Sequence, residues 1–254
     1  MDKQVLLDKI KTARKLRFLS NCYSLDVINK AERLWEKEDS FAFSYNDNGI
    51  NRLIYFANNY KILECLLNEI EKDRYYLEIM TKDLKEGFPV NLKIVAKMMR
   101  MSTSDCSSIF NNSSVLQYRD DSIGTEPDIN DAREINEILW NTFHTEISHL
   151  LTDDEIVEKI KRGQFLIHRS RQIDAVLQTD VMPKKFYINQ IVNLTDKKII
   201  HAILLKRLWN YVQNGGNYAY AWVEDKNIAS VKFHEKYGFK HDGMWNLVFG
   251  LNQS

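Results

Sequence analysis

Apolar side chains recur along this chain with two different periods, which together predict helices alternating with strands. In the second half, residues 128 to 143 repeat apolar side chains at helical spacing. Residues 151 to 163 predict a second helix, with Thr152 or Asp153 as its N-cap. Residues 196 to 216 predict a long helix that ends at Gly215 and Gly216.

Shorter apolar runs lie between and beyond these helices and predict strands. Residues 115 to 120 form a first short strand, and residues 164 to 170, 173 to 181 and 185 to 193 form a three-stranded meander. A strand follows at residues 217 to 225, then a helix at 228 to 239 and a closing strand at 244 to 250. The pattern is that of a mixed sheet flanked by helices.

The first half repeats this order in shorter form, after an amphipathic helix over residues 1 to 18. Helices are predicted at residues 24 to 39, 61 to 73 and 91 to 101, and a strand at 74 to 83. Residues 40 to 57 predict a hairpin that turns at Asp47, Asn48 and Gly49. We therefore interpret the chain as a duplicated unit whose first copy has lost a strand. A Ser/Asn-rich stretch at residues 103 to 115 places the boundary between domains 1–113 and 114–254.

Composition narrows the classes of function. The 254 residues include 44% apolar ones, and Lys plus Arg equals Asp plus Glu at 35 each. Zero net charge argues against a dedicated nucleic-acid or membrane-surface protein. Cys22, Cys65 and Cys106 form no disulfide framework, and no apolar run approaches the ~20 residues that span a bilayer. We expect a cytoplasmic protein.

The most specific motif is "NIASVKFHEKYGF" at residues 227 to 239, directly after the strand that ends in "AWVED". Together with the order of elements from residue 115 onward, it resembles the closing signature of the GNAT acetyltransferase superfamily. The resemblance implies an α/β (α+β) fold with a mixed central sheet and flanking helices, in a tandem arrangement. It also implies that the first half is a degenerate, inactive copy that supplies one wall of the acceptor site.

The resemblance further implies acetyl-CoA, or another acyl-CoA, as co-substrate and no metal. In the family, strands corresponding to "FYINQIV" and "YAYAWVE" run parallel and splay apart, and the pantetheine arm lies between them. The pyrophosphate sits at the N-terminus of the next helix, and Asn227 would orient the CoA arm. The implied donor-binding residues are Asn189, Gln190, Ile191, Val192, Lys197, Lys198, Ile199, Ile200, His201, Ala202 and Asn227.

This sequence departs from the family at the pyrophosphate segment, "LTDKKIIHAILL". In one register Lys197 replaces the usual Gln or Arg and Ile200 replaces the first glycine, while Ala202 satisfies the last position. In the other register, Ile199 and His201 stand where glycines belong. A bulky isoleucine replaces the first glycine in both, which predicts weaker donor binding or a different donor.

Two residues are candidates for proton transfer. His234 occupies the position of the tyrosine that protonates the CoA thiolate in the family, so it is the candidate general acid; the alternative is an exposed helix histidine. Glu224 ends the preceding strand and is the candidate general base, the alternative being a solvated charge. His144, Glu146 and His149 suggest a zinc site by spacing, but without a third convincing partner surface histidines are favoured.

These observations predict an N-acyltransferase that moves an acyl group from a CoA thioester to a small amine or peptide acceptor. One alternative keeps the fold and takes the acyl group from a carrier protein or from aminoacyl-tRNA. The other is a non-catalytic module that retains the fold for binding. No nucleic acid and no membrane is expected as a partner.

Overall fold

The chain folds into two compact units in a computed structural model that describes residues 2–70, 73–85, 87–90, 92–111, 124–195 and 199–251. Unit 1 consists of Met1–Met98, Thr145–His149 and Met244–Ser254. Unit 2 consists of Met99–His144 and Leu150–Gly243. Each unit is therefore built from segments that are distant in the sequence.

Unit 1 contains a mixed sheet in the order β2-β3-β4-β5-β11. The hairpin between β3 and β4 confirms the predicted turn, since Asn48 and Gly49 both have positive φ, at 52° and 92°. The strand β5 pairs parallel with β4 at Arg52 and Tyr76, and antiparallel with the end of β11. The elements are α1 (Lys3–Lys15), β1 (Leu19–Ser20), η1 (Asp26–Lys30), β2 (Ala31–Lys37), β3 (Ser40–Asp47), β4 (Ile50–Ala57), α2 (Tyr60–Leu67), β5 (Tyr75–Thr81) and β11 (Lys240–Leu251).

A helix covers each face of this sheet, which explains why β3 and β4 read as nearly continuous apolar runs. The helix α1 packs Leu6 and Ile10 against Phe43 and Phe56 on one face. The helix α2 packs Leu63 and other side chains against the opposite face, together with β5 and β11. The predicted helices at residues 1 to 18 and 61 to 73 are confirmed over α1 and α2.

The predicted helix at residues 24 to 39 is wrong. A short 3-10 turn, η1, is followed there by the strand β2, which pairs with β3. The neighbours Leu34 and Trp35 pack against the cores on opposite faces of the sheet, and this alternation belongs to a strand. The meander of unit 1 therefore has three strands, so this copy has not lost one as the duplication hypothesis supposed.

Unit 2 contains a sheet in the order β6-β10-β9-β8-β7. The predicted three-stranded meander is confirmed over β7, β8 and β9, and β10 pairs parallel with β9. The elements are β6 (Leu92–Thr103), η2 (Ser107–Asn111), η3 (Ile129–Asp131), α4 (Ala132–Thr142), α5 (Asp153–Lys161), β7 (Phe165–Arg169), β8 (Ile173–Met182), β9 (Lys185–Asn193), α6 (Ile199–Gln213), β10 (Ala219–Glu224) and α7 (Ile228–Lys236).

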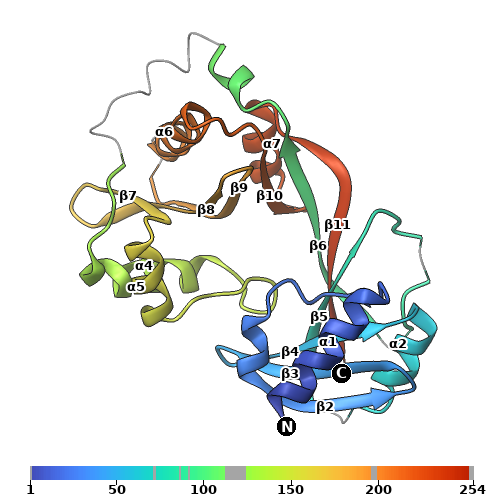
Figure 1. The fold of residues 1–254 in the computed structure, drawn as a ribbon. Coiled ribbons are helices and arrows are strands. Elements are labelled where there is room, and N and C mark those ends of the chain that lie inside the picture. The colour runs from blue at the N-terminus through green and yellow to red at the C-terminus, as the bar shows by residue number, and fades with distance from the viewer. Residues whose placement is uncertain are drawn as a thin grey trace. The chain divides into compact units, whose positions relative to one another are not determined.

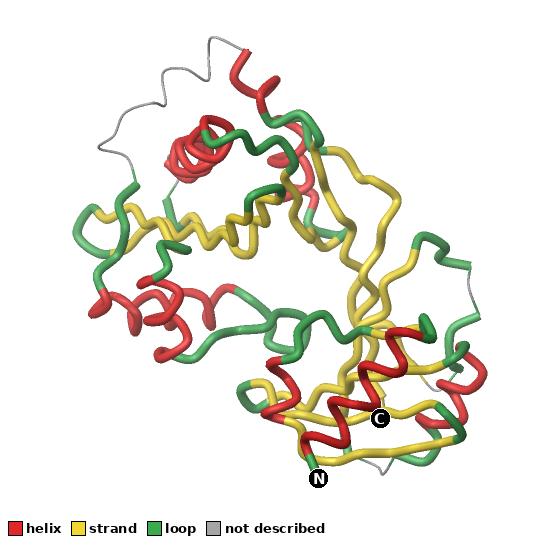
Figure 2. Tube along the Cα trace, viewed as in Figure 1, coloured by secondary structure: helices red, strands yellow, loops and turns green. Residues whose placement is uncertain are grey.

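The sheet of unit 2 lies between two helical layers, with α6 on one face and α4 and α5 on the other (Figure 1). Figure 2 shows the same layering, with the meander strands between the helices. Thr152 is the N-cap of α5 and forms a capping box with Glu155, as the sequence predicts. None of the helices in the described part of the chain is long and apolar enough to cross a membrane.

The predicted helix at residues 91 to 101 is also wrong, because this segment is the strand β6. Met99 and Met101 both contact the core beneath α6, and a spacing of two residues on one face is the period of a strand. The predicted strand at residues 115 to 120 and the boundary between residues 113 and 114 lie outside the described residues.

A buried arginine holds the segment Thr145–His149 in unit 1. The Arg52 side chain is only 4% exposed and its Nε donates to Asp47 at 2.7 Å. Its two terminal nitrogens donate to the backbone carbonyls of Thr145, Glu146 and Ser148 at 3.0 to 3.3 Å. The guanidinium of one residue on β4 therefore supplies hydrogen-bond donors to three backbone carbonyls of this short segment.

His149 completes a charged cluster with the same arginine. Its Nδ1 lies 2.7 Å from Asp47 and its Nε2 lies 2.7 Å from Glu78. Partial burial by itself would lower the pKa of His149, but hydrogen bonds to the two carboxylates raise it to about 9. Burial would raise the pKa of Glu78, but His149, Asn246 and Arg52 hold it at about 2. Both groups are therefore charged at neutral pH.

We predict that Arg52→Met lowers the free energy of unfolding by about 3 to 5 kcal/mol, because it removes one of the two cations that pair with Asp47 and the donors to three backbone carbonyls. The matched control is Arg33→Met, whose ion pair with Asp73 has side chains that are 53% and 52% exposed. That change should cost less than about 1 kcal/mol. Urea unfolding monitored by circular dichroism makes the comparison, and equal costs for the two variants would contradict the anchoring role of Arg52.

We also predict a characteristic pH window for the cluster. The raised pKa of His149 contributes stability that is complete below its ordinary value of 6.5 and is lost as the pH rises towards 9. The lowered pKa of Glu78 contributes stability that is complete above 4.5 and is lost as the pH falls towards 2. The stability difference between wild type and His149→Gln should therefore shrink from pH 6.5 to pH 9, and a difference that grows over this range would refute the assignment.

Candidate functional site

The candidate site of unit 2 begins where two parallel strands stop pairing. The register between β9 and β10 joins Phe186 to Ala219, Tyr187 to Tyr220 and Ile188 to Ala221. Beyond this last pair, β9 continues to Asn193 and β10 to Glu224 without a partner position between them in the described residues. The parallel arrangement predicted for these strands is confirmed, and the carboxyl ends of such strands are where open α/β sheets bind ligands.

A β-bulge lies at the same point. On the other side of β9, Ile188 stands opposite Thr179 and Gln190 stands opposite Gln178, so Asn189 is one extra residue in β9. A bulge of this kind bends its strand and reverses the alternation of side chains beyond it. The reversal is visible in the packing: Ile188 and Ile191 both contact the core beneath α6. The bulge therefore coincides with the separation of β9 from β10.

In unit 1, a side chain occupies the equivalent gap between two parallel strands. There β4 and β5 are paired only at Arg52 and Tyr76, and beyond this pair the amide of Asn21 takes the place of a strand. Its Nδ2 donates to Leu53 O and its Oδ1 accepts from Tyr55 N, both at 2.9 Å. No side chain in the described residues bridges residues 189 to 192 of β9 in this way. Backbone groups that face such a gap are free to bind a ligand.

Two polar side chains share the face of the unit 2 sheet opposite α6. On β10, Ala221 and Val223 contact the α6 core, so Glu224 points to the opposite face. Beyond the bulge, Val192 contacts the core under α4 and α5, and Gln190 shares its side of β9. Gln190 is 9% exposed, and its buried Oε1 has no hydrogen-bond partner among the residues that the structure describes. An unpaired buried acceptor of this kind is suited to receive an N–H group from a ligand.

Of the other residues expected to bind the donor, Ile199, Ile200, His201 and Ala202 form the start of α6. Ile200 and Ala202 are 3% and 2% exposed and belong to the core, so their side chains point into the protein. His201 is half-buried, and its Nδ1 is hydrogen-bonded to the Tyr237 hydroxyl at the end of α7. Lys197 and Lys198 lie outside the described residues.

Asn227 is the N-cap of α7. Its side-chain Oδ1 accepts a hydrogen bond from Ser230 N at 3.0 Å. This contact holds the asparagine of the signature at the start of the helix. Replacing Asn227 with alanine would destabilise the helix by about 1 kcal/mol. Asn227 is exposed, and the capping contact uses only its side-chain oxygen, so its amide N–H groups can serve as donors to a ligand.

His234 is buried on α7, not exposed, with 3% of its surface accessible. Its Nδ1 lies 2.8 Å from Ser230 O, and because a carbonyl can only accept, Nδ1 carries the proton. Burial lowers the pKa of His234 below its ordinary value. In the neutral ring Nε2 is therefore unprotonated, and it is buried without a partner.

His149 belongs to the charged cluster of unit 1, where its two nitrogens contact carboxylates on opposite sides of the ring. Because the two carboxylates lie at different nitrogens of the ring, they cannot both coordinate a metal ion that is bound to His149. Among the described residues, no group of three or more His, Cys, Asp or Glu side chains is arranged to hold a metal ion.

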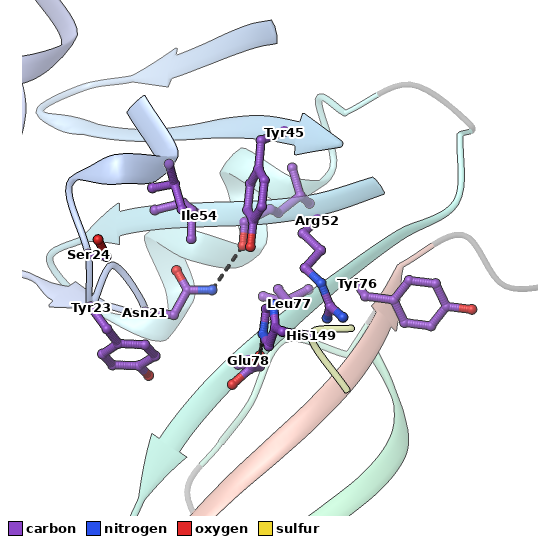
Figure 3. Close-up of a pocket in the computed structure, with 12 residues that line it drawn as sticks. Asn21, Tyr23, Ser24, Tyr45, Arg52, Ile54, Tyr76, Leu77, Glu78 and His149 are labelled. Carbon is purple, nitrogen blue, oxygen red and sulfur yellow. Dashed lines mark hydrogen bonds and ion pairs between the residues drawn. The ribbon is translucent and has the colours of Figure 1, made fainter. Parts of the chain in front are cut away.

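The structure also identifies residues that sequence reasoning missed, namely Asn21, Tyr23, Arg52 and Glu78. They line a pocket beside the separation of β4 and β5 (Figure 3). The only signal in the sequence was the presence of charged residues within two otherwise apolar strands, at Arg52 and Glu78. Asn21 gave no signal, because its role depends on a gap between strands that only the fold creates.

Comparisons with known proteins bear on the fold of the chain. No protein-family model matches the sequence, and no curated protein matches it either. A GNAT-family structure from Novosphingobium aromaticivorans is 11% identical with a TM-score of 0.57, covering 84% of this chain and 89% of that one. A GCN5-related N-acetyltransferase from Sphaerobacter thermophilus is 9% identical with a TM-score of 0.53, covering 83% and 76%. A GNAT-family acetyltransferase from Colwellia psychrerythraea is 10% identical with a TM-score of 0.51, covering 84% and 81%. This chain has a GNAT-like fold.

Proposed function

We propose that this protein is an N-acyltransferase that transfers an acyl group from acyl-CoA to an amine, with its donor site in unit 2. The observation that carries the proposal is the open edge of β9 at Asn189, Gln190, Ile191 and Val192. An extended pantetheine arm carries two amides, which can pair with such an edge as an added strand does. The equivalent edge of β4 is already paired by Asn21, so unit 1 has no place for the same arm.

The diphosphate of the donor would lie at the start of α6, where the N–H groups of the first turn have no helical partner. In the proposal Ile199, Ile200, His201 and Ala202 contribute backbone N–H groups, while Lys197 and Lys198 contribute charge. Asn227 would donate its free side-chain N–H to the arm from the opposite side. An acyl group attached to a carrier protein would depend less on these contacts than one attached to CoA.

The acceptor amine would lie on the face that carries Gln190 and Glu224. Gln190 Oε1 accepts one N–H of the amine and holds its lone pair towards the thioester carbon. As the C–N bond forms and the C–S bond breaks, the nitrogen loses a proton, which Glu224 takes as general base. The thiolate that leaves takes up a proton in turn.

His234 can supply that proton only as the imidazolium, because its Nδ1 proton is committed to Ser230 O. Burial lowers the pKa of His234, so the imidazolium fraction falls as the pH rises towards neutrality. A step in which His234 is the acid should therefore be faster at pH 5.5 than at pH 7.5. A thiolate that is protonated by water instead would show no such dependence on His234.

The donor site can be tested by titration calorimetry with acetyl-CoA together with amide hydrogen exchange. We expect micromolar binding, and slower exchange of the amides of residues 189 to 192 that face β10 in the complex. The amides of residues 53 to 55 serve as the internal control and should not change, because β4 is already paired. Absence of binding at millimolar acetyl-CoA would remove free acyl-CoA as donor, and binding without protection of β9 would remove the proposed pairing.

The acceptor site can be tested by measuring thiol release over a panel of amines. Glu224→Gln should lower kcat by about 10² to 10⁴, because the base is lost. Gln190→Leu should raise KM for the amine by about tenfold, because one hydrogen bond to the substrate is lost. The matched control is Glu235→Gln on the exposed side of α7, which should leave both constants unchanged. An unchanged kcat in Glu224→Gln would exclude Glu224 as the base.

A further inference from the structure

The pocket beside β4 and β5 in unit 1 has a volume of about 190 Å³, which suits a small metabolite. Tyr23, Tyr45, Glu78 and His149 gather around it, whereas the Tyr76 side chain points away from them (Figure 3). Val27 and Ile54, which belong to the core under α1, line it with aliphatic side chains, and Leu53 and Leu77 also line it. It is a mixed pocket of aromatic rings, one carboxylate and aliphatic side chains.

The two cationic side chains of this pocket, Arg52 and His149, have few N–H groups that are not already hydrogen-bonded. Four of the five N–H groups of Arg52 donate to Asp47 and to backbone carbonyls. Both nitrogens of His149 are taken by Asp47 and Glu78. An anionic ligand would therefore find no unpaired cationic group among the described residues that line the pocket.

The acceptors of the pocket, in contrast, are in surplus. Among the described residues, each oxygen of Glu78 accepts one hydrogen bond, from His149 or from Asn246, and keeps a further lone pair. Burial raises the pKa of the Tyr45 hydroxyl, and the charges of Asp47 and Glu78 raise it further. Hydrogen-bond acceptors therefore outnumber the available donors at this end of the pocket.

We propose that this pocket binds a small organic cation, an ammonium group on a short apolar body. The ammonium would lie between Glu78 and the rings of Tyr23 and Tyr45, where a carboxylate and aromatic faces both attract positive charge. The apolar body would contact Leu53 and Ile54. This site belongs to unit 1 alone and does not depend on acyl transfer in unit 2.

The bound cation competes with His149 for Glu78. The charged and titratable groups that face His149 are Asp47 on β3, Arg52 on β4 and Glu78 on β5, with Tyr45 beside them. While His149 is protonated it neutralises Glu78, and when it loses its proton Glu78 becomes available to the ligand. Affinity for a cation of fixed charge should therefore rise as the pH increases from 6.5 to 9.

Choline is a suitable probe because its charge does not titrate, and 3,3-dimethyl-1-butanol is its neutral isostere. In titrations of the full chain without any acyl donor, choline should bind about tenfold more tightly than the alcohol. His149→Gln should bind choline more tightly at pH 7 and lose the pH dependence. Equal binding of choline and the alcohol, preference for an anion such as acetate, or no binding at millimolar choline would each overturn the proposal.

Variants of Tyr23 keep the test independent of folding, because this residue is 57% exposed. Tyr23→Phe retains the ring and should keep most of the affinity for choline, whereas Tyr23→Leu removes the ring and should lower it severalfold. If Tyr23→Leu binds choline as the wild type does, the aromatic wall has no part in recognition and the proposal fails. Acetyl-CoA binding should be the same in both variants, which separates this site from the proposed donor site.

Discussion

The structure depends on one constraint of backbone chemistry: a strand that loses its neighbour must find other partners for its N–H and C=O groups. Both units contain a parallel pair that ends after a few residues, β4 with β5 and β9 with β10. In unit 1 the protein supplies the partners itself, through Asn21 and the short strand β1. In unit 2 the described residues supply none along residues 189 to 192, and this open edge of β9 is where we propose that the donor binds. Two similar arrangements of strands thus have opposite consequences for a ligand.

The bulge at Asn189 links this edge to the rest of the proposed site. Without the extra residue, β9 would keep its alternation, and Gln190 would point towards the α6 core. With it, Gln190 lies on the side of Val192, facing α4 and α5, where Glu224 of β10 also points. The inserted residue lies where β9 and β10 stop pairing, and it places Gln190 on the same face as Glu224. Bulges next to functional sites commonly act in this way.

The sequence predicted most of the elements whose pattern is local. The meander of β7 to β9, the turn at Asn48 and Gly49, and the cap at Thr152 all follow from period or from turn and cap chemistry. The strands β2 and β6 were mistaken for helices, because charged and apolar residues alternate irregularly there and pairing within a sheet decided the outcome. The donor edge could be named only through the resemblance of the closing motif. The closure of β4 by Asn21 and the pocket at Glu78 could not be predicted, because both require residues far apart in sequence to meet.

In the register that places Ile200 at the first glycine of the family, the position of its side chain on the helix changes what the substitution means for phosphate binding. Ile200 is 3% exposed and packs in the core beneath α6, as does Ala202. A side chain that points into the core does not occupy the space in front of the first turn, where the N–H groups of a helix are presented. The substitution therefore changes the packing under the helix, and it leaves the anion-binding property of a helix N-terminus to the backbone and to the charge around it. Loss of a glycine is evidence against phosphate binding only where its Cβ would lie between the backbone and the phosphate, and the buried position of Ile200 places its side chain elsewhere.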